Sequence, residues 1–335
     1  MIDKALLRRV AQRTMEWPFR LRGFGEGIAL RGLLATYAAT GESEYLGYVH
    51  GLTRAYLGSG VARSPEDHVA PSREFLEIYQ HTGDREILEA CFRLAALHRS
   101  FPVNQYQARS HRYDQPGWSK QIWVDCMDVD PPFLTLLARV SQRGEFLKQG
   151  VQELLAYSRL LQDANSGLFW HGYEDSCGHN GQLWARGNGW ALLGLVESLN
   201  EIPPETEGYE ELHRTLLRLA EALAKFQNGD GLWHTLVKDS SSYVETSLAV
   251  MVSYAFRLAY SHSLLNRGRF EAVSDRAAAA VLRHVGGSGA LQLVSSATPI
   301  GEARMYATRS FGTFPWGQGP LLLMLTQENY EDHQS

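Results

Sequence analysis

The spacing of apolar residues along the chain predicts twelve helices and few strands. Apolar positions recur at i, i+3, i+4 and i+7, the pattern of a helix with one buried face. The best candidate for a strand is residues 289–295 (GALQLVS). The predicted helices span residues 3–17, 28–39, 43–57, 69–81, 84–99, 126–141, 145–161, 188–200, 207–227, 246–261, 268–284 and 317–327.

A short motif recurs between predicted helices. Residues 37–45 (YAATGESEY) are similar to residues 79–87 (YQHTGDREI), and residues 140–146 are a weaker third copy. In each copy we expect glycine to end one helix in the left-handed conformation and the next helix to open at an acidic residue. Such turns join consecutive helices into antiparallel hairpins.

Short and long connections alternate along the chain. Short turns lie near residues 41, 83, 144, 203 and 267, and long loops span residues 18–27, 58–68, 100–125, 162–187, 228–245 and 285–316. Six hairpins with every long loop at the same end predict an all-α (α/α)6 barrel, a closed toroid of six inner and six outer helices. We expect one domain over residues 1–335, since no linker supports the alternative of two smaller α-domains. Function is expected where the long loops meet the inner helices.

Composition and charge exclude several classes of protein. The chain has 335 residues and a net charge of −5 without a Lys/Arg run, so nucleic acid is not expected as a partner. No stretch is apolar enough to span a membrane, and the N-terminus lacks a signal-peptide pattern. The three scattered cysteines fit a reducing compartment. We therefore expect a cytoplasmic protein.

The sequence gives no sign of a metal or a cofactor. The twelve histidines form no His-x3-His or His-Glu-x-x-His pair, and the cysteine spacing is not that of a zinc site. No strand precedes the glycines around Asn188, so they do not read as a dinucleotide or phosphate loop. We expect neither a metal nor a cofactor.

The loop at residues 167–186 has the composition of a sugar-binding pocket. It combines aromatic rings, which stack on pyranoses, with a histidine, an arginine and carboxylates that hold polar groups or move a proton. Residues 231–234 (GLWH) repeat part of residues 167–171 (GLFWH) one hairpin later. A small oligosaccharide is the expected partner.

Five segments, in order, resemble a known family. They are residues 123–134 (WVDCMDVDPPFL), 167–175 (GLFWHGYED), 184–190 (WARGNGW), 243–251 (YVETSLAVM) and 316–323 (WGQGPLLL). The chain resembles the unsaturated glucuronyl and rhamnogalacturonyl hydrolases of glycoside hydrolase families 88 and 105, with residues 184–190 closest to the family 105 signature. The resemblance implies an (α/α)6 barrel, in agreement with the helix count.

The resemblance also implies a reaction. These enzymes remove the 4,5-unsaturated uronic acid that polysaccharide lyases leave at the non-reducing end of an oligosaccharide. An aspartic acid protonates C4 of the C4=C5 double bond, water adds at C5, and the hemiketal opens and frees the aglycone. The form of residues 184–190 favours unsaturated galacturonyl–rhamnose fragments, while the aglycone sugar and the oligomeric state stay open.

Two aspartates match the family's catalytic positions. Asp125 matches the general acid, which has to keep its proton near neutral pH; the alternative is a helix N-cap. Asp67 resembles the second aspartate and is expected to hold sugar hydroxyls or position water; it too has an N-cap alternative, before the helix at 69–81.

The substrate contacts implied by the resemblance come from later segments. His171 is expected to bind a hydroxyl or orient water, and Arg186 to fork onto the substrate carboxylate. An ion pair of Arg186 with an acidic neighbour such as Glu174 is the alternative. Trp184 and Trp190 are expected to stack on the sugar, and for Glu245 substrate contact and helix capping are equally expected.

Asp128 and Asp130 depart from the family pattern. They are expected either as first-turn helix carboxylates or, if Asp128 points inward, as residues that change subsite preference. Two other functions remain open: a sugar epimerase on the same toroid, which needs paired histidines where this chain has Asp125, and a non-catalytic carbohydrate-binding protein.

Overall fold

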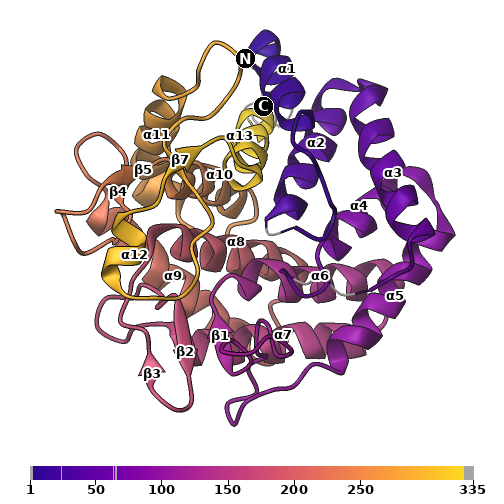
Figure 1. The fold of residues 1–335 in the computed structure, drawn as a ribbon, viewed down its shortest axis with the longest axis horizontal. Coiled ribbons are helices and arrows are strands. Elements are labelled where there is room, and N and C mark those ends of the chain that lie inside the picture. The colour runs from indigo at the N-terminus through magenta and orange to yellow at the C-terminus, as the bar shows by residue number, and fades with distance from the viewer. Residues whose placement is uncertain (1–2, 24, 63, 65, 328–335) are drawn as a thin grey trace.

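Six inner helices close a ring around the axis of the molecule. In this computed structural model, which describes residues 3–23, 25–62, 64 and 66–327, each inner helix packs against the next and the last against the first (Figure 1). The (α/α)6 barrel is confirmed, although the predicted domain limits, residues 1 and 335, lie outside the described residues. The inner helices are α2 (Glu26–Thr40), α4 (Ser72–Thr82), α6 (Cys126–Ser141), α8 (Ala185–Glu201), α10 (Ser247–Ser261) and α13 (Pro315–Gln327).

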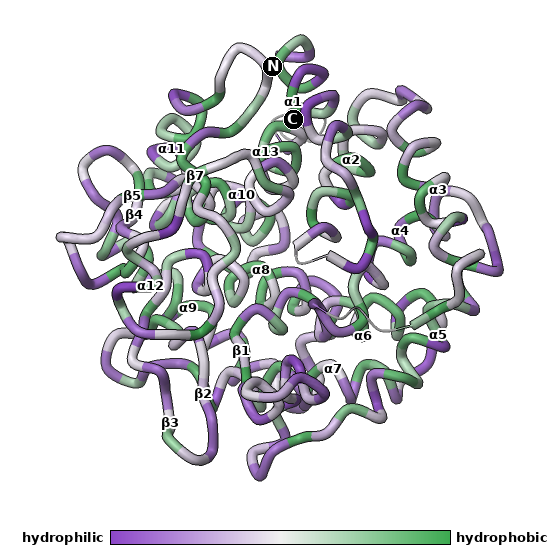
Figure 2. Tube along the Cα trace, viewed as in Figure 1, coloured by the Kyte–Doolittle hydropathy of each residue, from purple (hydrophilic) through white to green (hydrophobic). Residues whose placement is uncertain are grey.

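Within the described part of the chain, six outer helices surround this ring, each packed on an inner helix. They are amphipathic and bury one face, so that green and purple positions alternate along α3, α5 and α11 in Figure 2. In α13, by contrast, every residue from Pro315 to Thr326 is buried. The outer helices are α1 (Lys4–Met15), α3 (Ser43–Gly58), α5 (Arg85–Arg99), α7 (Gly144–Leu161), α9 (Tyr209–Phe226) and α11 (Arg267–Arg283).

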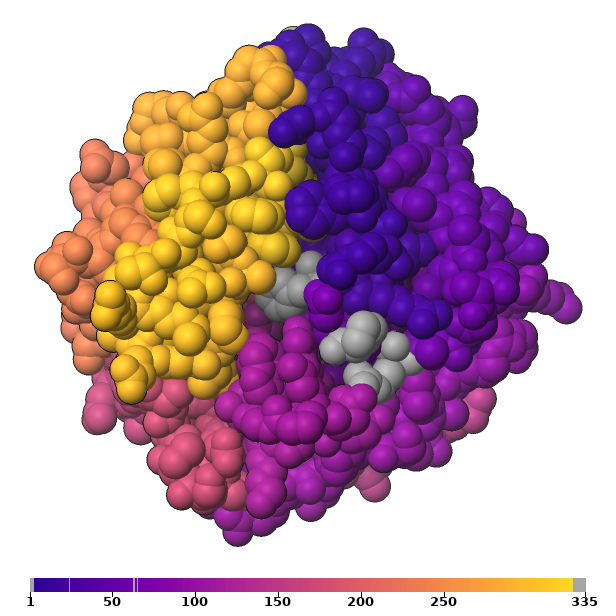
Figure 3. All heavy atoms as spheres, viewed as in Figure 1, coloured from indigo at the N-terminus to yellow at the C-terminus, as the bar shows by residue number. Residues whose placement is uncertain are grey.

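The long loops interlock at one end of the barrel through short strands. A three-stranded antiparallel sheet joins the 100–125 loop to the 162–187 loop, and a bridge between Trp184 and Leu236 joins the 162–187 loop to the 228–245 loop. The 285–316 loop carries a two-stranded ribbon and the short helix α12 (Ala303–Ala307). Figure 3 shows this face, where the N-terminal part of the chain (indigo), the 100–125 loop and the 285–316 loop (yellow) meet. The strands are β1 (Gln121–Trp123), β2 (Gly172–Glu174), β3 (Gly178–His179), β4 (Trp233–His234), β5 (Val244–Glu245), β6 (Val294–Ser295) and β7 (Phe311–Gly312).

Two of the three predicted glycine turns have the expected geometry. Gly41 and Gly83 have φ of 72° and 68°, and their N–H groups donate to the carbonyls of Tyr37 and Tyr79. The third copy differs from the prediction. There Gln142, at φ 56°, takes the left-handed position, and Gly144 opens α7 instead of ending α6. The predicted strand at 289–295 shortens to β6, and none of the described helices is long and apolar enough to cross a bilayer.

Glycines let α8 approach its neighbours closely. The prediction started this helix at residue 188, but it begins at Ala185 because Gly187 and Gly189 are helical and face Val124 and Met251. A Cβ on Gly194 would lie 2.0 Å from the carbonyl oxygen of Met127, in the first turn of α6. The position of α6 therefore depends on this missing side chain.

We expect Gly194→Ala to destabilise the fold by about 1–3 kcal/mol, because the overpacked Cβ has only backbone to displace. The displaced turn carries Asp125, so catalytic activity should fall as well. Thermal unfolding measures the first effect. The matched control is Gly51→Ala on α3, where a Cβ meets nothing within 4 Å; removing a helical glycine there should stabilise by about 0.5–1 kcal/mol. Equal melting temperatures for the two variants would contradict this account.

Candidate active site

An open pocket lies among the N-terminal halves of α2, α4, α6 and α8, with about 410 Å³ of empty space that includes part of its opening to solvent. Three of the predicted site residues, Asp67, Asp125 and Trp190, line it together. Its remaining lining includes the polar side chains of Arg31, Arg73, Glu74 and Asp128, with Gly25 and Gly27 providing backbone. Two carboxyl groups and an indole that face one cavity are typical of a binding site for a small polar molecule.

Asp125 is placed by the β1–β2 pairing. Trp123 pairs with Gly172, and the N–H of Val124 donates to the carbonyl of His171 at 3.0 Å, which holds the turn before α6. Asp125 occupies the N-cap position but makes no capping hydrogen bond, so the capping interpretation is wrong. The side chain is 2% exposed, and among the described residues no donor is aligned on either carboxyl oxygen. A buried carboxyl without an aligned hydrogen-bond donor is costly to fold and is typical of a functional site.

Asp67 is buried beside Asp125. Its Oδ2 accepts the N–H of Gly25 at 2.7 Å, and α4 starts only at Ser72, so Asp67 does not cap that helix. Burial raises the pKa of Asp67 well above its usual value; the Asp125 charge adds to this, and the Gly25 N–H opposes it. Asp67 therefore binds its proton more tightly than an exposed aspartate does, and in its protonated form it can donate a hydrogen bond into the cavity.

His171 lies behind Asp125 and not in the cavity wall. Its Nε2 is 3.2 Å from Oδ2 of Asp125, although the N–H is not aligned for a linear hydrogen bond. The ring is completely buried between Trp184, with centroids 4.4 Å apart, and Trp123, with centroids 5.4 Å apart. The predicted direct contact of His171 with substrate is therefore corrected: it touches the candidate acid instead.

The predicted role of Arg186 is contradicted by its surroundings. The side chain is completely buried, Nη1 donates to the carbonyl and hydroxyl of Ser295, and Nη2 donates to the carbonyl of Ser296. Its ion-pair partner is Glu245, 3.5 Å away, and not Glu174. Both Nη groups are thus occupied by the last long loop and Glu245, and only Nε has no hydrogen-bond partner among the described residues, so no pair of donors is left for a substrate carboxylate.

Trp184 and Glu245 are buried with Arg186. The Arg186 guanidinium lies 4.5 Å from the Trp184 ring centroid, and neither Trp184 nor Glu245 is exposed. Glu245 accepts from the hydroxyls of Ser247 and Ser295, at 2.6 and 2.9 Å. These two predicted contacts are corrected in the same way: the residues anchor the loop that covers the site, and of the two predicted tryptophans only Trp190 lines the cavity.

A buried charge network forms the floor of the cavity. The Arg31 guanidinium lies 3.0 Å from Glu74, 3.3 Å from Asp128 and 3.2 Å from Glu197. Burial raises the pKa of Asp128, with Arg31 opposing the shift. Both expectations for Asp128 hold, since it is a carboxylate in the first turn of α6 and it points inward to line the cavity. Its charge, however, is engaged by Arg31.

Comparison with known proteins assigns the family. The family model for Glycosyl Hydrolase Family 88 matches residues 2–330. The chain belongs to this family. It is 25% identical over 335 residues to the unsaturated rhamnogalacturonyl hydrolase YesR of Bacillus subtilis, covering 96% of this chain and 93% of the relative. It is also 24% identical over 240 residues to an unsaturated 3S-rhamnoglycuronyl hydrolase of Formosa agariphila, covering 66% of this chain and 57% of that relative.

Solved structures share the fold of this family 88 hydrolase. A possible member of family GH105 from Salmonella enterica superposes with a TM-score of 0.87 at 24% identity, covering 97% of this chain and 93% of that one. The unsaturated glucuronyl hydrolase of Bacillus sp. GL1 superposes with a TM-score of 0.78 at 15% identity, covering 97% and 95%. The expected glycoside hydrolase family and its barrel are therefore confirmed.

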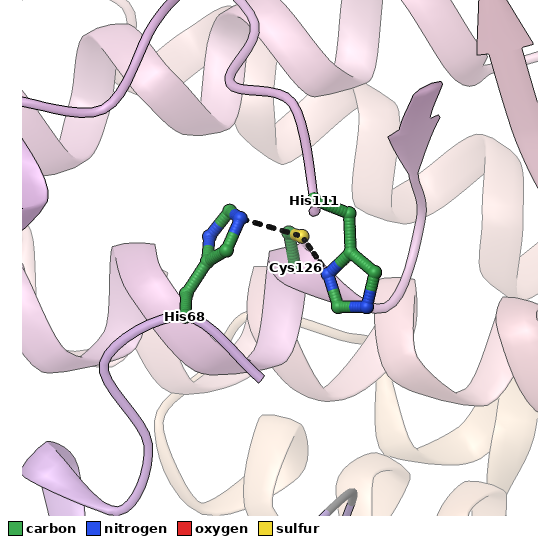
Figure 4. A group of neighbouring side chains, drawn as sticks. All are labelled: His68, His111 and Cys126. Atoms are coloured by element: carbon green, nitrogen blue, oxygen red, sulfur yellow. Dashed lines mark hydrogen bonds between the residues drawn. The ribbon is translucent and has the colours of Figure 1, made fainter. Parts of the chain in front are cut away.

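Behind Asp67, the hydrolase buries a cluster of His68, His111 and Cys126 (Figure 4). Nδ1 of His68 lies 2.5 Å from Asp130 Oδ2, and its Nε2 lies 3.0 Å from the carbonyl of Ser110. Nε2 of His68 also lies 3.9 Å from Sγ of Cys126, which in turn lies 3.3 Å from Nδ1 of His111 (Figure 4). His68 belongs to both groups of potential metal ligands found among the described residues, and its contacts with Asp130 and Ser110 already engage both of its ring nitrogens.

Asp130 is therefore an ion-pair partner and not a first-turn dipole carboxylate. It also lies 3.5 Å from Nε2 of His98. Burial by itself would raise the pKa of Asp130, but His68 and His98 outweigh burial and lower it. Burial would likewise lower the pKa of His98, but Glu153 and Asp130 raise it to about 9.

Sequence reasoning missed Arg31 and Tyr306 as site residues. Arg31 had a usable signal, a charged residue inside the apolar run of residues 28–39. Tyr306 had none, since it lies in the irregular 285–316 loop and reaches His171 from 135 positions away in the sequence.

Proposed function

We propose that this chain removes a 4,5-unsaturated uronic acid from the non-reducing end of lyase-generated oligosaccharides by hydrating the C4=C5 double bond. The observation that carries the proposal is the pair Asp67 and Asp125 in one cavity, with no donor aligned on the Asp125 carboxyl among the described residues. Family membership and the similarity to enzymes named for unsaturated uronyl substrates support it.

In this proposal Asp125 is the general acid and base. Its proton adds to C4, the π electrons of C4=C5 form the new C4–H bond, and the oxygen of a water molecule bonds to C5. The proton that the water loses restores Asp125. The C5 hemiketal then opens and expels the aglycone. Protonated Asp67 donates to a ring hydroxyl or to the water, and Trp190 packs against the sugar.

The finer details are part of the same proposal. Similarity to YesR favours an unsaturated galacturonyl–rhamnose fragment, as in glycoside hydrolase family 105. We place the enzyme in the cytoplasm, acting on small imported oligosaccharides, and treat the chain as one catalytic domain.

The test follows the ultraviolet absorbance of the conjugated double bond in three disaccharides, unsaturated galacturonyl–rhamnose and those made by pectate and glycosaminoglycan lyases. Absorbance should fall fastest with the first, and in D2O one deuterium should appear at C4. The matched control is saturated galacturonyl–rhamnose, which should release no sugar because it has no double bond to protonate. Hydrolysis of this control, or no loss of absorbance with any of the three, would refute the proposal.

A further inference from the structure

A tyrosine from the last long loop binds the buried face of His171. The Tyr306 hydroxyl, carried by α12, lies 2.5 Å from Nδ1 of His171, and both side chains are completely buried. On the other side of the same ring, Nε2 lies 3.2 Å from Oδ2 of Asp125. The direction of the Tyr306 hydrogen bond therefore determines what His171 presents to the candidate acid.

The amide of Asn180 fixes that direction. Its Oδ1 accepts the backbone N–H groups of Gly172 at 3.2 Å and Gln182 at 3.4 Å, so the amide cannot be flipped. Its Nδ2 must then be the group that donates to the Tyr306 hydroxyl at 2.9 Å and to the carbonyl of Gly301 at 3.2 Å. The Tyr306 oxygen is thus an acceptor from Asn180.

The Tyr306 proton has one acceptor among the described residues. Burial raises the pKa of Tyr306, so the phenol keeps its proton. With Asn180 donating to its oxygen, the O–H points to Nδ1 of His171. An imidazole that accepts at Nδ1 must carry its proton on Nε2.

We propose that Asn180 and Tyr306 are positioning residues that hold His171 as the Nε2–H tautomer, so that His171 presents a proton and not a lone pair to Oδ2 of Asp125, 3.2 Å away. The role of His171 in the reaction rests on the proposed function, whereas the tautomer of His171 does not. In the reaction, the carboxylate left when Asp125 protonates C4 is stabilised by the Nε2–H. Because His171 has no free lone pair, the proton that restores Asp125 comes from the water that adds to C5.

The tautomer is tested by nuclear magnetic resonance of the full-length chain labelled with 15N-histidine, without substrate. The His171 signals are assigned by their loss in His171→Gln. Near neutral pH we expect the 15N shift of an unprotonated nitrogen at Nδ1 and of a protonated nitrogen at Nε2. A wild-type ring that is protonated on Nδ1 overturns the proposal.

Asn180→Asp is the most direct test, because it should reverse the direction of the hydrogen bonds from residue 180 through Tyr306 to His171 while leaving Tyr306 and His171 intact. A carboxylate at this position accepts the Tyr306 proton, the Tyr306 oxygen then accepts from Nδ1, and the proton pattern of His171 should change to include Nδ1–H. Tyr306→Phe removes the donor to Nδ1 and should also perturb the Nδ1 shift. An unchanged His171 spectrum in Asn180→Asp would overturn the proposal.

Steady-state kinetics test the effect of the tautomer on catalysis. Tyr306→Phe should lower kcat by about tenfold, equivalent to ~1.4 kcal/mol of transition-state stabilisation, with KM nearly unchanged, because substrate does not touch Tyr306. The matched control is Tyr260→Phe at the far end of α10, which should change neither. A rise in KM with kcat unchanged would contradict positioning. If wild type cleaves no unsaturated substrate, the proposed function fails while the tautomer result still stands.

Discussion

Asp125→Asn is expected to lower kcat by about 10³-fold, the usual contribution of a general acid and base. Asparagine has the same shape but no proton to give to C4 and no carboxylate to take one from water. The Asp125 side chain makes no capping hydrogen bond, and no donor among the described residues is aligned on it. The substitution should therefore leave the melting temperature unchanged or slightly raised, which separates catalysis from folding.

The matched comparison is Asp67→Asn, measured by the same ultraviolet assay. Asp67 accepts the N–H of Gly25, and burial raises its pKa and so favours its protonated form. The asparagine amide of the variant keeps an acceptor for Gly25 and a donor toward the cavity, in nearly the same geometry. We expect kcat of Asp67→Asn to fall by about 10–100-fold, which corresponds to the loss of about one to two hydrogen bonds to the substrate. A larger loss at Asp67 than at Asp125 would exchange the two roles, and full activity of Asp125→Asn would remove Asp125 from the chemistry.

Local sequence rules predicted the fold because they act within one or two turns. Helical periodicity and the glycine turns at Gly41 and Gly83 depend on neighbouring residues only. The start of α8 was misplaced because Gly187 and Gly189 are ordinary loop signals unless the contacts with Val124 and Met251 are known. The two-residue strands were missed because their pairing joins loops far apart in the chain.

The same distinction explains the site. Asp67, Asp125 and Trp190 stand where long loops meet inner helices, and they line one cavity as the motif order indicates. Trp184 and Arg186 belong to an equally clear motif, yet both are completely buried, and residues 295–298 accept hydrogen bonds from the Arg186 guanidinium. Burial by a distant loop leaves no local pattern, so sequence identified the residues around the site but not which of them face the substrate.

The second large effect is expected at Arg31. Arg31→Met should lower the free energy of unfolding by about 3–5 kcal/mol, because it leaves Glu74, Asp128 and Glu197 buried without their shared cation. Methionine fills much of the same volume, so the loss is electrostatic. The matched control is Arg54→Met on the outer surface, whose ion pairs with Asp84 and Glu86 are half exposed and should contribute about 0–1 kcal/mol.

The pH dependence of the Arg31→Met variant identifies the cause. Burial already raises the pKa of Asp128, and without Arg31 the shift grows, so the folded state binds a proton more tightly than the unfolded state. Stability from such a group is fully present below its pKa in the unfolded chain and is lost as the pH rises from there through its folded pKa. The deficit against wild type should therefore be smaller at about pH 5 than at about pH 7 in denaturant unfolding. Arg31→Met combined with Asp128→Leu should recover part of the loss, since it removes one of the uncompensated charges. A deficit independent of pH, with no recovery in the double variant, would mean that Arg31 acts through packing and not through its charge.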